Sequence, residues 1–351
     1  MADSLDIRSI SRREFLRLSS AALLALLVTD RNSFAYAQSL HADDTKTMLG
    51  RITTNKVDMF NTPSLDGKLI RTLWKDLVLP ISRIEIGTGE PSHNRVWYQL
   101  ENEGFVHSGS VQPVKIETND PVNSIPKKGI LAEVTVPFTD ALWDPNRKER
   151  VAYRLYYTST HWITAIVEDN EGTQWYEILE DFYQYKYYVN PAHLRLIPPE
   201  EVKMLSPDIP AQDKKLEVRL RDQIVVAYEG DTPVQMMRCS GGTAYHRGYL
   251  TPTGVFNTNY KRPSRHMVNS RLASAYSYDL PGVPWICYFT EEGVAFHGTY
   301  WHNDFGRPRS HGCINLLSEN AKWIYRWTTP QVPYTEQLVD KRGGTKVEIA
   351  L

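Results

Sequence analysis

Residues 296–316 hold the side chains whose types and spacing could do covalent chemistry. His297 opens a loop rich in glycine and arginine, and Gly312 and Cys313 close it. A free cysteine thiol has a pKa of about 8.5, and a neighbouring imidazolium or helix start can lower it to roughly 3.5–7.5. The spacing is typical of a cysteine nucleophile with its histidine base, and it predicts an accessible, low-pKa thiolate at Cys313.

Two elements are expected to hold this pair. Residues 294–296 follow a turn signal and favour a short strand that ends at His297. Residues 318–327 favour a helix, with Ser318 as its N-cap and Pro330 as its stop. The nucleophile would therefore lie between a rigid strand and the start of a helix.

Backbone groups beside the cysteine could also take part in the reaction. Gly312 would let the chain approach a substrate closely, because it has no side chain. The consecutive N–H groups of His311, Gly312 and Cys313 could form an oxyanion hole. One such donor can change a rate about 10²–10³-fold.

These motifs resemble the signature of the L,D-transpeptidase family with a YkuD-type catalytic domain. His297-Gly298-Thr299 matches its His-Gly-Thr segment, and residues 310–315 match its Ser-His-Gly-Cys-hydrophobic-Asn segment. A third element, Thr-Pro-x-Gly before an aromatic residue, is matched at residues 251–256. The resemblance covers roughly residues 214–351. It implies a mainly β fold, with a β-sandwich catalytic domain that holds one or two short helices.

The resemblance also implies an activity on peptidoglycan stem peptides. Cys313 would attack an L,D-peptide bond and leave a thioester that an acceptor amine resolves. His297 would act as base and later as acid, oriented by the carbonyl of Gly298, and neither cofactor nor metal is needed. The implied catalytic residues are Cys313, His297, Gly298, Ser310, His311 and Gly312, and the candidate substrate contacts are Arg309, Asn315, Arg307, Thr299, Thr253 and Gly254.

Other functions stay open at this point. The same stretch holds four side chains that zinc could bind: His297, His302, His311 and Cys313. Structural zinc motifs usually bring paired cysteines, whereas this cysteine stands alone. A metal-dependent wall hydrolase and a noncatalytic wall-binding protein are therefore the alternatives from other classes. Water as the acceptor would make the enzyme an L,D-carboxypeptidase on the same residues.

The size and charge of the chain narrow its class. Its 351 residues suggest two to three domains, and 41% hydrophobic residues are ample for packed cores. The formal net charge is −1, so the overall charge favours neither nucleic acid nor an anionic membrane as a partner.

The first residues read as an export signal. Residues 11–17 carry a twin-arginine pattern, residues 21–28 are a short apolar run, and residues 35–37 form an Ala-x-Ala cleavage site. We expect a mature protein that begins near Gln38, with the twin-arginine export machinery as a partner and the cell envelope as its location. An uncleaved anchor is the alternative, but a membrane span needs about 20 apolar residues.

Between the signal and the catalytic region lies an internal repeat. Trp97 and Trp175 recur after 78 residues, within similar apolar surroundings, and residues 56–63 resemble residues 133–139. Both copies resemble bacterial SH3-like modules, small β-barrels that could bind the wall. The predicted order is a signal peptide (1–37), two SH3-like modules (46–118 and 125–199), a linker (200–213) and the catalytic domain (214–351).

Two local features also lead to predictions. The second copy has an aromatic run over residues 182–188, which favours packing over a sugar platform. Cys239 and Cys287 lie in apolar runs, which favours two buried free thiols over a disulfide.

The catalytic region reads as antiparallel strands, with one loop that carries cations. Residues 216–220, 224–228 and 234–239 favour strands joined as hairpins. Residues 256–285 read as a loop, either a lid that binds carboxylates or a solvated segment. Its cations are Lys261, Arg262, Arg265, His266 and Arg271.

The export signal can be tested by fractionation. Replacing both Arg12 and Arg13 with lysine should leave the precursor in the cytoplasm, because the arginine pair is the recognised part of the signal. Immunoblots of cytoplasmic and envelope fractions would measure this, with Arg8→Lys as the exported control. Normal export of the double variant would contradict a twin-arginine signal.

Overall fold

The computed structural model describes residues 48–245, 247–269 and 277–351. The predicted signal peptide, with Arg12 and Arg13, lies outside these residues, as does Arg271. The described residues form 24 strands and one α-helix, α3 (Ser318–Trp327), so the mainly β fold is confirmed. None of the helices in these ranges is long and apolar enough to cross a membrane.

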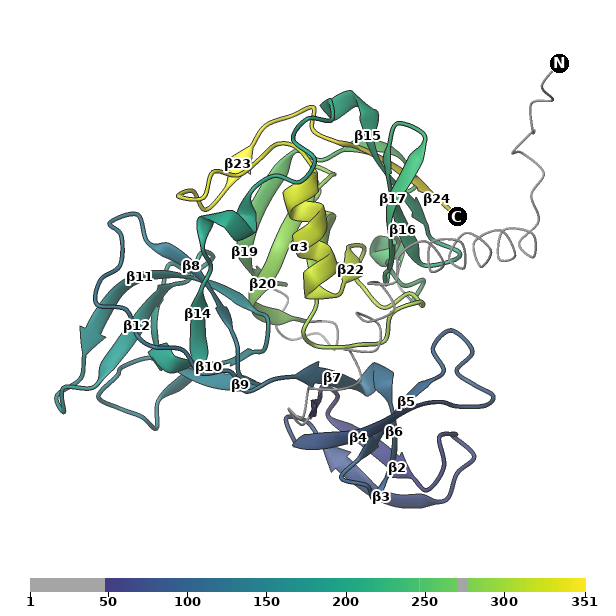
Figure 1. The fold of residues 1–351 in the computed structure, drawn as a ribbon, viewed down its shortest axis with the longest axis horizontal. Coiled ribbons are helices and arrows are strands. Elements are labelled where there is room, and N and C mark those ends of the chain that lie inside the picture. Colours follow the sequence, from purple (N-terminus) through teal and green to yellow (C-terminus); the bar gives the residue numbers. More distant parts are fainter. Residues whose placement is uncertain (1–47, 246, 270–276) are drawn as a thin grey trace, which may run out of the picture. The chain divides into compact units, whose positions relative to one another are not determined.

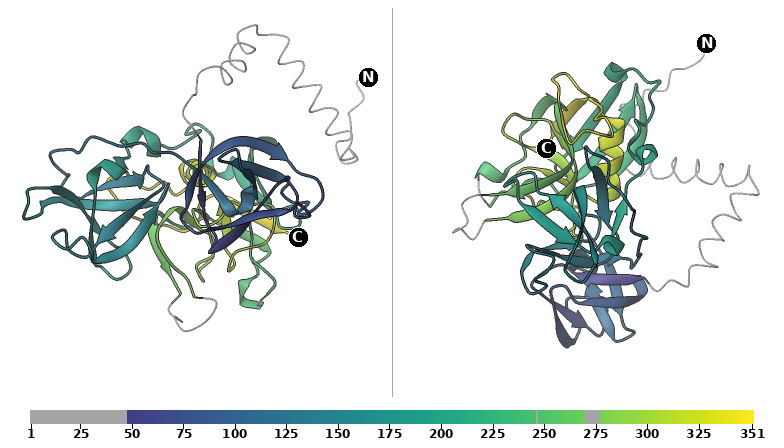
Figure 2. Two further views of the ribbon diagram at one scale, coloured as in Figure 1. Left: turned by 90° about the horizontal axis from the view of Figure 1, so that it is seen from below. Right: turned by 90° about the vertical axis from the view of Figure 1, so that its left-hand side faces the viewer.

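The internal repeat forms two sheets with the same strand order. Figures 1 and 2 draw the first copy in purple to blue and the second mainly in teal. The first copy is ordered β3-β2-β6-β5-β4-β1-β7, and the second β10-β9-β13-β12-β11-β8-β14, which is the same order seven strands later. The first-copy strands are β1 (Leu49–Ile52), β2 (Lys56–Phe60), β3 (Leu69–Trp74), β4 (Val78–Ile86), β5 (Val96–Leu100), β6 (Gly104–His107) and β7 (Val111–Val114). The second-copy strands are β8 (Ile130–Val134), β9 (Phe138–Leu142), β10 (Val151–Tyr156), β11 (Thr160–Glu168), β12 (Gln174–Leu179), β13 (Lys186–Val189) and β14 (Leu194–Leu196).

The two copies correspond strand by strand, with one correction to the sequence alignment. Trp97 lies in β5 and Trp175 in the matching strand β12, as the 78-residue spacing predicts. The upstream match of residues 56–63 with 133–139 is wrong, because β2 corresponds to β9, which begins 82 residues later. The difference arises in the loop after β4, which is four residues longer than the loop after β11.

The catalytic region forms two five-stranded sheets around one core. Their orders are β17-β16-β15-β24-β18 and β22-β21-β20-β19-β23. Trp285 and Trp327 are buried in this core, and Figure 1 shows α3 beside β20 and β22. The strands are β15 (Lys214–Arg219), β16 (Ile224–Glu229), β17 (Thr232–Arg238), β18 (Gly254–Asn257), β19 (Tyr260–Val268), β20 (Asp279–Tyr288), β21 (Ala295–Gly298), β22 (Ile314–Leu316), β23 (Val339–Asp340) and β24 (Lys346–Ala350).

Several local predictions for this region can be compared with the structure. The antiparallel hairpins of β15, β16 and β17 are confirmed. The helix spans the predicted residues, but Ser318 is not its N-cap. That position is Leu317, and the Ser318 hydroxyl instead lies 2.8 Å from Thr158 Oγ1 of the second copy. Cys239 and Cys287 are buried free thiols, as predicted.

The predicted cationic lid is wrong. Residues 260–268 and 279–288 of its segment form the long hairpin of β19 and β20, and Lys261, Arg262 and His266 are buried. The buried Lys261 ammonium donates to the carbonyls of Tyr325 and Thr328 at the C-terminal end of α3, where positive charge is stabilising. Arg262 and Arg265 lie elsewhere on the hairpin.

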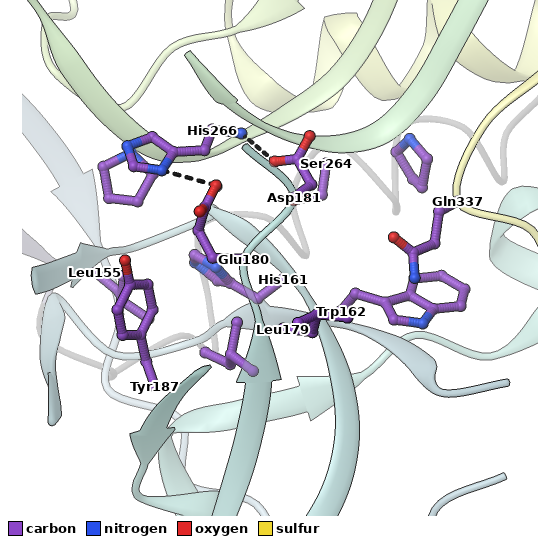
Figure 3. A pocket seen from close by; sticks show the side chains of 14 residues that line it. Leu155, His161, Trp162, Leu179, Glu180, Asp181, Tyr187, Ser264, His266 and Gln337 are labelled. Carbon is purple, nitrogen blue, oxygen red and sulfur yellow. Dashed lines mark hydrogen bonds and ion pairs between the residues drawn. The ribbon is translucent and has the colours of Figure 1, made fainter. Parts of the chain in front are cut away.

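Those two arginines meet acidic residues of the second copy. Arg262 and Arg265 each lie 2.8 Å from Asp181. His266 Nδ1 lies 2.9 Å from Glu180, and the His266 amide donates to Asp181 (Figure 3). The cavity in this figure holds about 30 Å³, which is too small for a peptide substrate.

The aromatic run of the second copy packs around the same histidine. The rings of Phe182 and Tyr183 lie 6.3 and 5.8 Å from the His266 ring, and Tyr187 is buried. Packing therefore accounts for Tyr187, while Phe182, Tyr183 and Tyr185 contact neighbouring rings and stay partly exposed.

The residues of the predicted linker pack against the catalytic region. Val202 belongs to the catalytic core, together with Leu131 and Trp162 of the second copy. Glu201 forms ion pairs with Arg195 and with Lys322 of α3. The second copy thus covers apolar surface that a chain beginning at residue 214 would expose.

His266 gives a testable link between pH and stability. Burial alone would lower its pKa, but ion pairs with Glu180 and Asp279 raise it above 6.5. The protonated ring therefore stabilises the fold below about pH 6.5, and this contribution is lost as pH rises through the raised pKa, by up to about 1.4 kcal/mol per pH unit. Thermal unfolding from pH 6 to pH 9 should show a steeper loss for the wild type than for His266→Gln. Parallel curves would contradict this link.

Candidate active site

Two parallel strands bring the histidine and the cysteine together. β21 pairs with β22 so that Phe296 lies opposite Ile314 and His297 opposite Asn315. Cys313 directly precedes β22, so this register sets it beside Ala295. Because residues two apart in a strand share a face, the side chains of His297 and Cys313 lie on the same face of the sheet.

The imidazole of His297 has a defined tautomer. Its Nδ1 lies 3.0 Å from the carbonyl oxygen of Gly298. A carbonyl only accepts, so Nδ1 carries the proton and Nε2 keeps the lone pair of a base. Burial lowers the pKa of His297 to about 4, although the hydrogen bond to Gly298 opposes this shift. The ring is therefore neutral at pH 7.

The thiol of Cys313 is also neutral in the free protein. The side chain is partly buried, and its Sγ lies 3.8 Å from the Gly293 carbonyl oxygen. Burial raises the pKa of the thiol to about 11, although a hydrogen bond with the Ala295 backbone acts in the other direction. The predicted low-pKa thiolate is wrong for this state, because desolvation penalises both charged forms.

Side-chain hydroxyls hold the turn that contains the cysteine. Ser310 Oγ donates to the Cys313 carbonyl and accepts from the Gly312 amide at 3.0 Å. Thr251 Oγ1 donates to the Gly312 carbonyl at 2.7 Å and accepts from the Gly242 amide at 2.8 Å. Gly312 has φ +122°, a conformation that strongly favours glycine.

This network changes the expected oxyanion hole. The N–H of Gly312 is already bound to Ser310, so it is not a free donor as predicted. The backbone amides of His311 and Cys313 remain the candidate donors to an oxyanion. The side chain of His311 lies at the surface, where its ring packs on Tyr249 at 4.2 Å and Tyr278 at 5.2 Å.

The predicted substrate contacts divide into buried and exposed residues. Asn315 is buried, with its side-chain nitrogen 3.0 Å from His302 Nε2, and it therefore supports the sheet. Thr299 is also buried, and its hydroxyl has no hydrogen-bond partner among the described residues. Thr253 and Gly254 are exposed at the start of β18, so these two are open to a ligand.

The two arginines of the catalytic loop converge on one carboxylate. Arg307 Nε and Arg309 Nη1 lie 2.6 and 2.7 Å from Asp304 Oδ2. Burial would raise the pKa of Asp304, but hydrogen bonds from His93 and Arg309 lower it to about 2. Asp304 is therefore ionised and offsets part of the positive charge expected here.

The candidate zinc ligands do not lie together in the structure. His302 is buried between the Asp304 amide and Asn315, while His311 lies at the surface. No cluster of three or more His, Cys, Asp or Glu side chains suited to a metal occurs within the described ranges.

The sequence analysis did not identify three residues that support the candidate active site. Thr251 was noted only as part of a motif, and His302 only as a loop histidine or a zinc ligand. Asp304 is the sole acidic residue between His297 and Cys313. That isolation among arginines was the signal that could have revealed it.

Comparisons with known proteins agree with the motifs. Residues 213–349 match the YkuD family model, described as the L,D-transpeptidase catalytic domain. The chain is 26% identical over 129 residues to the putative L,D-transpeptidase YciB of Bacillus subtilis (strain 168). That alignment covers 34% of this chain and 63% of the relative, which is less than two thirds of its length.

Solved structures of L,D-transpeptidases are also similar to part of the chain. One is L,D-transpeptidase 3 from Mycobacterium tuberculosis with a faropenem-derived adduct, at 17% identity and a TM-score of 0.33, covering 49% of this chain and 76% of that one. Another is the L,D-transpeptidase from Xylanimonas cellulosilytica DSM 15894, at 23% identity and a TM-score of 0.28, covering 40% and 62%.

The protonation state of the pair can be tested by alkylation. The rate of iodoacetamide addition at Cys313 should keep rising well above pH 8, because the thiol pKa is raised to about 11. Peptide mapping by mass spectrometry at each pH would follow the site, and Cys313→Ala gives the background. A rate plateau between pH 5 and pH 8 would instead indicate a preformed thiolate–imidazolium pair.

Proposed function

We propose that the YkuD-type L,D-transpeptidase catalytic domain of residues 213–349 acts on peptidoglycan through a thioester on Cys313. Its products would be cross-links between stem peptides, or stems joined to a protein or an amino acid. The observation that carries this proposal is the geometry of His297. The Gly298 carbonyl accepts from its Nδ1, which leaves the Nε2 lone pair as the base, and the register of β21 with β22 sets Cys313 on the same face of the sheet.

The first half-reaction forms the acyl-enzyme. His297 Nε2 takes the thiol proton as Sγ attacks the carbonyl carbon of an L,D-peptide bond. The amides of His311 and Cys313 would stabilise the oxyanion. When the intermediate collapses, His297 returns the proton to the leaving amine, and the terminal D-residue departs.

The second half-reaction releases the acyl group. An acceptor amine attacks the thioester while His297 takes its proton, and collapse returns that proton to the Cys313 sulfur. Because both groups are neutral at rest, proton transfer accompanies bond formation and does not precede it. Water as the acceptor would give the L,D-carboxypeptidase on the same residues.

We also place this activity in the cell envelope. The support is the predicted twin-arginine signal, because peptidoglycan lies outside the cytoplasm. The two copies of the repeat would bind the wall as SH3-like modules. The metal-dependent hydrolase finds no support in the positions of His302 and His311.

A carbapenem β-lactam tests the nucleophile. It should add once, at Cys313, and His297→Ala should slow the addition at least about 10²-fold by removing the base. Intact-mass and peptide mapping would follow the adduct, with His193→Ala, a distant second-copy histidine, as the matched control. His302→Ala would not serve as a neutral control, because the ring is buried and hydrogen-bonded.

Cys239 and Cys287 report on selectivity in the same experiment. Both are buried, and burial raises the pKa of each thiol, so neither should be labelled. Labelling at either residue, or an unchanged rate in His297→Ala, would contradict the mechanism.

A further inference from the structure

A groove of about 340 Å³ lies where the first copy of the repeat meets the catalytic loop. We call it the first-copy groove. Phe60, Leu65 and Pro91 of the first copy give it an apolar wall. Arg307 and Arg309 of the catalytic loop line it as well. Asp58 and Asp304 line the groove too, so it suits a ligand that combines apolar groups with a negative charge placed beside the arginines.

Hydrogen bonds fix the two sides of the groove to each other. Asn303 donates two hydrogen bonds to the end of the first copy: its backbone amide donates to the Gly109 carbonyl at 3.1 Å, and its side chain donates to the Val111 carbonyl at 3.1 Å. Arg51 donates to the Tyr300 carbonyl. These bonds do not depend on a ligand, so the groove is preformed.

Asp304 organises the charged side of the groove. It is only 3% exposed and ionised, and His93 Nε2 of the first copy lies 2.8 Å from it. The same carboxylate holds Arg307 and Arg309. Asp304 balances one of these two guanidiniums, and Asp58 on the first-copy side of the groove balances the other in net charge.

Arg307 keeps part of its guanidinium open to solvent. Its side chain is 50% exposed, although its Nε contacts Asp304. The outer N–H groups of a guanidinium held in this way can donate to a carboxylate in a bidentate manner. Asp58 lines the same groove, is exposed, and accepts a hydrogen bond from Thr72.

We propose that the first-copy groove is a second binding site, which takes a peptide with a free carboxylate and short aliphatic side chains. The arginines would bind the carboxylate, and the apolar wall would cover the aliphatic groups. The identification of this peptide as a stem peptide of the wall rests on the proposed function. Because Arg307 and Cys313 belong to one loop, the bound peptide would lie on the segment that carries the nucleophile.

Two substitutions that each remove one charge should change peptide affinity in opposite directions, which distinguishes this site from a general folding defect. In the full mature chain carrying Cys313→Ala, which prevents turnover, Asp58→Asn should tighten binding of a synthetic tetrapeptide stem about threefold by removing a like charge. A gain in affinity cannot come from misfolding. Arg307→Gln should weaken the same binding about tenfold, because a charge-assisted contact is lost.

Calorimetric titration would measure these dissociation constants. The same stem with its carboxylates amidated should bind weakly and equally to all variants. Asp231→Asn and Arg342→Gln, at exposed sites outside the groove, are the matched controls and should change nothing.

Two results would overturn the inference. One is a dissociation constant that neither Asp58→Asn nor Arg307→Gln shifts, and the other is equal binding of the amidated stem. Acylation of Cys313 by the β-lactam is measured separately in the unblocked enzyme. Failed acylation with shifted dissociation constants would refute the proposed function alone, whereas acylation with unshifted constants would refute this site alone.

Discussion

The parallel pairing of β21 with β22 is the constraint on which the site depends. Parallel neighbours cannot be joined by a tight turn, because the chain must return to the starting end of the sheet. The segment between Gly298 and Ile314 makes this return, and it contains most of the predicted site residues. The catalytic loop is thus a crossover connection that a sheet of this topology requires.

A long connection without regular structure must be held from outside. Ser310 and Thr251 fix the end that carries Cys313. Asp304 and Asn303 fix the middle through contacts with the first copy. The first copy therefore shapes the active-site loop, in addition to any role in binding the wall.

Burial determines the protonation states of the histidine and the cysteine in the free protein. His297 and Cys313 lie in surroundings that penalise charge, so the free pair is neutral. Such a pair avoids a permanent thiolate, which is the form of cysteine most open to oxidation. In the proposed reaction the attack step would then supply the charge separation, and the hydrogen bond from His297 to Gly298 would stabilise the imidazolium as it forms.

The sequence predicted the structural features that depend on residues nearby in the chain. It missed the contacts that depend on residues far away in the chain. The strand at His297, the helix over residues 318–327 and the repeat all follow from local periodicity. Arg262 and Arg265 of β19 were misread because Asp181, their partner, lies far away in the sequence. Gly312 was assigned a free amide for the same kind of reason, since no spacing rule shows that Ser310 folds back onto it. Local patterns thus located the nucleophile, while the charges and hydrogen bonds around it required the structure.

The central claim is that Cys313 and His297 carry out acyl transfer on a stem peptide. The most direct measurement is mass spectrometry of the products formed by the purified protein from a tetrapeptide muropeptide, with and without an added acceptor amine. The account predicts loss of the terminal D-residue together with a new amide bond to the acceptor, and neither product from Cys313→Ala. Products retained in Cys313→Ala, or cleavage within the glycan strand, would contradict it.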